Sequence, residues 1–171
     1  MSDYSQTSYP SGAPAGHSAG ADDKKMVIIA IVGAAIALIG SLINWSVTDK
    51  ATGDIGGVKG TDGDGVISLI TALAAAALFI GAMVAKKHIL HAVGAVVSLV
   101  TLVIGGIAMA NPDRVVVSYF MDEGAPNEKA AEKVAEQLEF SAGPGVYMVL
   151  VGALLSLVCG FLAFKKANSG R

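Results

Sequence analysis

The stretch FSAGPGVYMVLVGALLSLVCGFLAF occupies residues 140–164 and contains no Asp, Glu, Lys or Arg. Residues 26–48, 65–85 and 88–112 also lack charged side chains, so all 12 basic and 14 acidic residues lie in the rest of the chain. A helix of about 20 residues crosses the roughly 30 Å of hydrocarbon in a bilayer, and each stretch reaches that length. The sequence therefore predicts an all-α membrane protein built as a four-transmembrane-helix bundle.

The same composition excludes several classes of protein. A soluble enzyme with one packed core needs charged side chains on every exposed face, which four such stretches do not provide. The formal net charge of −2 leaves no basic surface for nucleic acid. A disulfide framework needs paired cysteines, whereas Cys159 is the one cysteine in the chain and is expected to be a small packing residue.

The chain divides at the borders of the apolar stretches. Residues 1–25 are rich in Ser, Gly, Ala and Pro, so we expect a disordered tail. The expected transmembrane spans are 26–45, 66–85, 89–110 and 145–164. The loops 46–65 and 111–144 separate them, and residues 165–171 form a short C-terminal tail.

Basic residues near the span ends predict the orientation in the bilayer. One side carries seven basic and three acidic residues, whereas the loops on the other side carry five basic and eleven acidic residues. The basic residues of the first side are Lys24, Lys25, Lys86, Lys87, Lys165, Lys166 and Arg171. We therefore expect a multi-pass plasma-membrane protein with both termini in the cytoplasm.

The two outer loops are expected to form a small extracytoplasmic cap. In the first loop Val47 and Val58 allow a short hairpin at most. In the second, residues 114–121 suit a strand or an interfacial segment, and Asn127 is a good N-cap for an amphipathic helix over 128–139.

Two features of this cap suggest contact with a partner protein. The helix over 128–139 carries a narrow, alanine-rich apolar stripe that suits close packing on another protein surface. Trp45 ends the first span, where tryptophan commonly anchors a helix at the bilayer interface, and it is a second contact candidate. The stripe consists of Ala130, Ala131, Val134, Ala135 and Leu138.

Small residues spaced four apart are expected to pack the helices, because association in lipid depends on close backbone approach. The row Gly152-xxx-Ser156-xxx-Gly160 is the most specific, and it suits either internal packing or contact with a partner. The other members of such rows are Gly33, Ala37, Ser41, Ala77, Gly81, Gly94, Ser98 and Gly105.

The sequence contains few residues suited to coupled transport or metal binding. The spans contain no charged residue, which disfavours proton- or ion-driven carriers but allows an uncoupled pore. His88 and His91 supply at most half of a metal site. Asp62 and Asp64 begin a calcium-loop pattern that fails at Val66, so they suit only weak divalent-cation binding.

Catalytic and cofactor motifs are likewise not apparent. The expected outer side contains no histidine for a Ser-His pair, and the chain has no phosphate-binding loop or dinucleotide fingerprint. The expected cytoplasmic side consists only of the two tails and a short turn. We therefore expect a protein that is not an enzyme and that has no catalytic residues, no cofactor and no structural metal.

Three features together resemble a known group of proteins. A polar tail rich in Pro, Gly and Ser precedes the first span, Asn44-Trp45 follows it, and Gly63-Asp64-Gly65 stands directly before the second span. This pattern is similar to small four-transmembrane-helix proteins of actinobacteria. The resemblance implies the topology but no shared activity. In size and kind the chain also resembles small accessory subunits of actinobacterial respiratory supercomplexes.

These observations predict a non-catalytic accessory, assembly or scaffold subunit of a larger plasma-membrane or cell-envelope complex. One alternative is a homo-oligomeric pore or passive carrier for a small neutral solute. Another is a membrane sensor that responds to divalent cations through Asp62 and Asp64. The lipid bilayer and a protein of the same complex are the expected partners.

Overall fold

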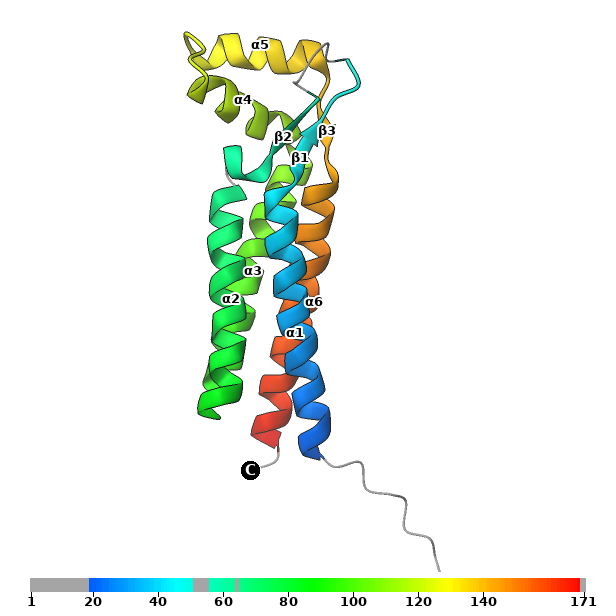
Figure 1. Cartoon of the computed structure of the whole chain (residues 1–171), viewed down its shortest axis with the longest axis vertical. Helices are drawn as coiled ribbons and strands as arrows, with labels where there is room; N and C mark the ends of the chain where they lie inside the picture. The colour runs from blue at the N-terminus through cyan, green and yellow to red at the C-terminus, as the bar shows by residue number, and fades with distance from the viewer. Residues whose placement is uncertain (1–18, 51–55, 64, 170–171) are drawn as a thin grey trace, which may run out of the picture.

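The protein is a mostly helical chain in which four helices are long and apolar enough to cross a membrane (Figure 1). The computed structural model describes residues 19–50, 56–63 and 65–169. The long helices are α1 (Ala19–Leu42), α2 (Gly65–Ala85), α3 (Ile89–Ala110) and α6 (Pro144–Ser169). The prediction of a mostly helical chain with four helices able to span a membrane is confirmed.

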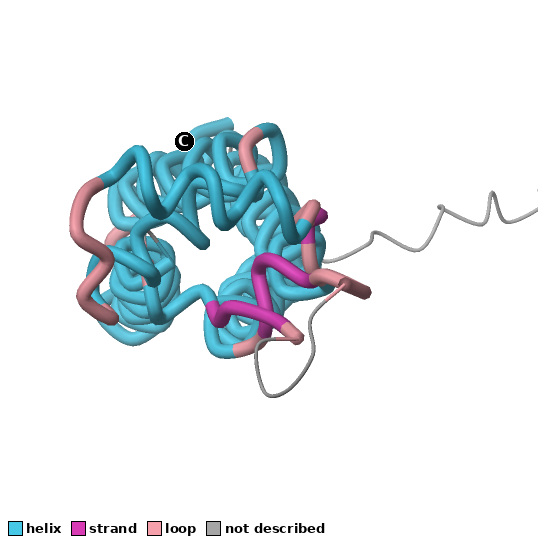
Figure 2. Tube along the Cα trace, turned by 90° about the horizontal axis from the view of Figure 1, so that it is seen from above, coloured by secondary structure: helices cyan, strands magenta, loops and turns pink. Residues whose placement is uncertain are grey.

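The long helices form a ring in which each packs against two neighbours, in the order α1, α2, α3, α6 (Figure 2). The most extensive contact is between α1 and α6, the first and last helices of the chain. The first residues of α1 and the last residues of α6 lie at the same end of the bundle, which we call the terminal end (Figure 1). The connections at the opposite end, the cap end, form a folded layer.

This layer, the cap, combines short helices with a small sheet. The strands β1 (Asn44–Val47), β2 (Gly57–Lys59) and β3 (Ser141–Ala142) pair antiparallel in the order β2-β1-β3. The helical part consists of the 3-10 turn η1 (Gly60–Asp62) and the helices α4 (Pro112–Asp122) and α5 (Glu128–Leu138). The short hairpin allowed for the first loop therefore exists, and the second loop adds a third strand to it.

Residues 114–121 belong to helix α4, so the prediction of a strand was wrong, whereas the alternative of an interfacial segment stays a prediction. The β-branched run Val115-Val116-Val117 favours a strand locally. However, Pro112 is well suited to the first helical turn, and Val115 and Val116 lie on one helical face that is 2% and 0% exposed. Burial of this face against the cap core outweighs the local propensity.

Several expected boundaries also shift. Helix α1 already begins at Ala19, so residues 19–25 are helical rather than disordered, while residues 1–18 lie outside the described residues. It ends at Leu42 because Asn44–Val47 pairs as a strand. Helix α6 continues to Ser169 and takes up most of the expected C-terminal tail.

Two apolar cores hold the molecule together. One joins the cap to the bundle, with Trp45, Val116 and Val146 fully buried in it. The other lies towards the terminal end around Phe79, which is 0% exposed. The first core places α4 and α5 firmly over the bundle, so any surface they carry has a defined position.

Candidate functional site

The row of small residues in α6 packs inside the bundle against α1. A Cβ atom on Gly33 would lie 2.6 Å from the carbonyl oxygen of Gly152 and 2.8 Å from the backbone nitrogen of Ser156. The Ser156 hydroxyl donates a hydrogen bond of 2.6 Å to the carbonyl oxygen of Ala30. Ala37 continues the same contact, because a Cβ on Gly152 would lie 2.5 Å from its backbone nitrogen, whereas the buried Ser41 side chain faces α2. In this structure Gly152 and Ser156 therefore pack α6 onto α1.

Two further glycines of these rows, Gly94 and Gly160, lie against the ring of Phe79. A Cβ on Gly94 would lie 2.8 Å from ring atom Cε1, and a Cβ on Gly160 would lie 2.6 Å from it. Further along α3, Ser98 and Gly105 are also buried. One aromatic side chain of α2 thus fills the space that glycines leave on α3 and α6.

The row expected on α2 is not a packing face. Ala77 is exposed, and a Cβ on Gly81 would meet only a Leu90 methyl at 3.8 Å. Helix α2 packs instead through the neighbouring face that includes Phe79. Small residues fill both faces of α2, so spacing alone did not identify the buried one. The buried residues of α2 are Gly65, Ser68, Ala72, Ala75, Phe79 and Ala82.

Two pairs of hydroxyl groups link neighbouring helices inside the bundle. The Ser41 and Ser68 hydroxyls are hydrogen-bonded at 3.2 Å, which links α1 to α2. The Thr101 hydroxyl donates to that of Thr71 at 2.8 Å, which links α3 to α2. These hydrogen bonds satisfy polar groups that lipid would leave unpaired.

The apolar stripe of α5 packs on the protein itself, which corrects the prediction of a partner contact there. Ala131 and Ala135 are 1% and 0% exposed, Ala130 and Leu138 are partly buried, and Val134 is the one exposed member. The N-cap prediction is confirmed, because the Asn127 side chain accepts a hydrogen bond of 2.9 Å from the Ala130 amide.

Trp45 was also predicted wrongly as an interfacial anchor or partner contact. Its side chain is 0% exposed, and its Nε1–H donates a 3.0 Å hydrogen bond to the Gly40 carbonyl. A Cβ on Gly60 or Gly145 would lie within 2.7 Å of the indole ring. The ring joins the end of α1, the start of α6 and the cap.

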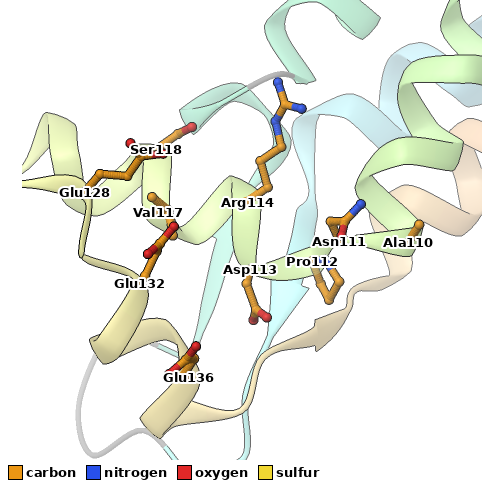
Figure 3. A pocket seen from close by; sticks show the side chains of 10 residues that line it. All are labelled: Ala110, Asn111, Pro112, Asp113, Arg114, Val117, Ser118, Glu128, Glu132 and Glu136. Atoms are coloured by element: carbon orange, nitrogen blue, oxygen red, sulfur yellow. The ribbon is translucent and has the colours of Figure 1, made fainter. Parts of the chain in front are cut away.

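The cap carries an acidic groove between α4 and α5, and the larger of its two adjoining cavities has a volume of about 680 Å³ (Figure 3). Glu128, Glu132 and Glu136 follow one another at four-residue spacing on α5 and therefore share one face of that helix. Asp113 and Arg114 contribute from the first turn of α4. The full lining is Ala110, Asn111, Pro112, Asp113, Arg114, Val117, Ser118, Glu128, Glu132 and Glu136.

The groove carries an excess of negative charge. Four carboxylates line it against the single guanidinium of Arg114, and in Figure 3 the Arg114 side chain extends away from the three glutamates. An adjoining cavity of about 420 Å³ adds Asp122 and again includes Glu128. A surface with this charge attracts cationic groups. We call the two cavities together the acidic groove.

Sequence reasoning missed this groove, although part of its signal was present. The spacing of the three glutamates on α5 predicts one acidic helix face. The opposite wall depends on α4 being a helix, and residues 114–121 were not expected to be one. The groove exists because the apolar faces of α4 and α5 are turned towards the cap core and leave their polar faces outside.

The residues considered for metal binding do not form a metal site in the part of the chain that the structure describes. Within it, no three His, Cys, Asp or Glu side chains come close enough to hold a metal ion. The rings of His88 and His91 lie 6.4 Å apart at the terminal end. Asp62 ends the turn η1 before α2, and Asp64 lies outside the described residues.

Comparison with known proteins assigns the chain to no family. No protein-family model matches it, and no curated protein or solved structure matches it either. The resemblance to small actinobacterial four-helix membrane proteins therefore stays a prediction.

Proposed function

We propose that the protein is a non-catalytic accessory subunit of a plasma-membrane complex and that its cap docks a partner outside the cytoplasm. Lysines gather at the terminal end, in Lys24, Lys25, Lys86, Lys87, Lys165 and Lys166, which supports a cytoplasmic position for both termini. The cap then faces the periplasmic or external side. In this arrangement the bundle anchors the protein in the membrane and the cap carries the surface that binds the partner.

The acidic groove is the observation that carries this proposal. It lies on the layer that packs on the bundle through the apolar core containing Trp45, and its walls come from the two helices α4 and α5. Its carboxylates suit a cationic, Lys- or Arg-containing segment of a partner protein. The apolar stripe of α5 is occupied within the chain, so the polar face of α4 and α5 is the surface left for docking.

A passive pore, which the sequence also allowed, has less support. Five cavities among the described residues lie at the two ends of the bundle or on its side. Between the ends, Phe79 and the glycines around it fill the centre. The buried hydroxyls are hydrogen-bonded to one another or to backbone carbonyls. A proteoliposome flux assay with small neutral solutes tests this alternative, and we expect no flux above empty vesicles.

Affinity purification from detergent-solubilised membranes tests docking at the groove. The tagged chain is expected to recover a partner at fixed stoichiometry, and the double variant Glu132→Gln/Glu136→Gln is expected to lose it. The matched control is Asp49→Asn/Glu123→Gln, which removes the same charge from exposed positions outside the groove. Recovery is also expected to fall as salt concentration rises, because salt screens exposed charges.

Two results would count against the proposal. Recovery of the chain alone, under mild extraction and at native expression level, would argue against an accessory subunit. Equal loss of the partner from the groove variant and from the control would show that overall charge, and not the groove, determines binding.

A further inference from the structure

A second charged cavity lies at the opposite end of the molecule, where all four long helices meet. It has a volume of about 300 Å³. Helices α1, α2 and α6 and the turn into α3 each contribute to its wall. The lining residues are Lys24, Val27, Ala82, Met83, Lys86, His88, His91, Ala163 and Ala167.

The polar part of this cavity is basic. Lys24 comes from α1 and Lys86 from the end of α2, while His88 and His91 come from the turn and first residues of α3. No carboxylate is among the described residues that line it. Ammonium groups and imidazole N–H groups brought together from three elements are suited to an oxyanion such as phosphate.

Lys86 occupies an unusual backbone position. Its φ is 53°, in the left-handed region that favours glycine or asparagine directly after a helix. At this position the side chain lines both the 300 Å³ cavity and a neighbouring one of about 400 Å³.

The apolar part of the cavity suits an acyl chain or glycerol backbone. Val27, Ala82 and Ala163 are at most 3% exposed and close the floor towards the bundle. Met83, which is 40% exposed, also lines the cavity. Basic groups therefore lie beside apolar ones at the end of membrane-spanning helices, which is where the headgroup of a lipid is found.

We propose that this cavity binds the phosphate group of an anionic membrane lipid. The two lysines neutralise the phosphate, the histidines donate hydrogen bonds to its oxygens, and Met83 contacts the apolar part of the lipid. Such a lipid would fix the ends of α1, α2 and α6 at the terminal end, where the cap gives no support.

Native mass spectrometry of the full-length chain in mild detergent tests this proposal, with phosphatidylglycerol and phosphatidylcholine as probes. The unmodified chain is expected to retain phosphatidylglycerol about ten-fold more tightly than phosphatidylcholine, because charge-assisted contacts stabilise the bound anionic lipid. The variant Lys24→Gln/Lys86→Asn is expected to lose this preference. Asparagine tolerates the left-handed backbone, so the variant keeps the turn.

The variant Lys25→Gln/Lys87→Asn is the matched control, because it removes two neighbouring charges that do not line the cavity. It is expected to keep at least most of the ten-fold preference. An equal loss in both variants would show general attraction to a basic surface and would overturn the proposal.

Inorganic phosphate at millimolar concentration distinguishes the lipid from a soluble source. If free phosphate displaces phosphatidylglycerol completely, or binds lipid-free protein as tightly, the cavity serves a soluble phosphate and the lipid assignment is wrong. Retention of the lipid in the presence of free phosphate supports the proposal. Acidic-groove variants provide a further comparison, since they are expected to bind phosphatidylglycerol normally.

Discussion

Gly33 on α1 and Gly152 on α6 lie so close that a Cβ atom on either residue would be within 2.6 Å of the other's carbonyl oxygen. Such a distance leaves no room for any side chain. In lipid, close backbone approach replaces the hydrophobic driving force that packs helices in water. This contact brings the backbones of the first and last helices close together.

We predict that Gly152→Ala weakens the bundle. The added methyl group must displace the backbone of α1, which costs about 2–3 kcal/mol and lowers the unfolding temperature by about 5–10 °C. Thermal unfolding in detergent measures this through Cys159, which is 8% exposed and reacts with a thiol-specific fluorophore when the bundle opens.

The control for this prediction is Gly106→Ala on α3, where an added Cβ meets no atom within 4 Å. We expect its unfolding temperature to stay the same or to rise slightly, because alanine favours a helix more than glycine does. Similar losses in the two variants would contradict the packing seen between α1 and α6.

A second prediction concerns Phe79 and Gly160. Gly160→Ala places a methyl group 2.6 Å from the Phe79 ring and is expected to destabilise the bundle by about 2 kcal/mol. Combining it with Phe79→Leu is expected to cost less than the sum of the two single changes, because the smaller side chain makes room. A double-mutant cycle on unfolding temperature measures the coupling, and strictly additive effects would disprove direct contact.

A third prediction concerns the single tryptophan. Because Trp45 is fully buried, its fluorescence is expected to be blue-shifted and protected from iodide in detergent or in vesicles. Trp45→Phe removes the hydrogen bond to the Gly40 carbonyl and is expected to cost about 2 kcal/mol. Ready quenching by iodide would instead indicate the interfacial position expected from the sequence.

A fourth prediction concerns the cap of α5. Asn127→Ala removes the acceptor for the Ala130 amide and is expected to destabilise α5 by about 1 kcal/mol, whereas Asn127→Asp keeps an acceptor. Hydrogen exchange over residues 128–138 is expected to accelerate in the alanine variant alone. Equal exchange in both variants would show that packing, and not the N-cap, holds this helix.

A fifth prediction tests the proposed orientation. In a Cys159→Ala background, Glu123→Cys on the cap is expected to react with a membrane-impermeant maleimide in intact cells. Ser169→Cys at the terminal end is expected to react only after the membrane is opened. Both positions are exposed in the structure, so accessibility depends on the side of the membrane. The reverse pattern would place the acidic groove in the cytoplasm.

Much of the fold could be read from composition and spacing. Charge-free stretches of sufficient length identify four membrane helices, because a charge inside a bilayer is expensive and such a stretch is unusual in water. Asn127 identified the start of α5 because capping is a local interaction within one turn. The same local reasoning failed at Val115–Val117, where a β-branched run lies in a helix.

The acidic groove and the burial of Trp45 depended on contacts between distant segments. Trp45 meets Gly60 and Gly145, and the acidic wall of α5 meets the wall of α4 only after the cap has folded onto the bundle. Likewise α2 has small residues on more than one face, so the ring of neighbours determines which face is buried. Whether a stretch can cross the membrane depends on the residues within that stretch. Which helix face is buried, which helices are neighbours and where the groove forms depend on contacts between segments that are far apart in the sequence.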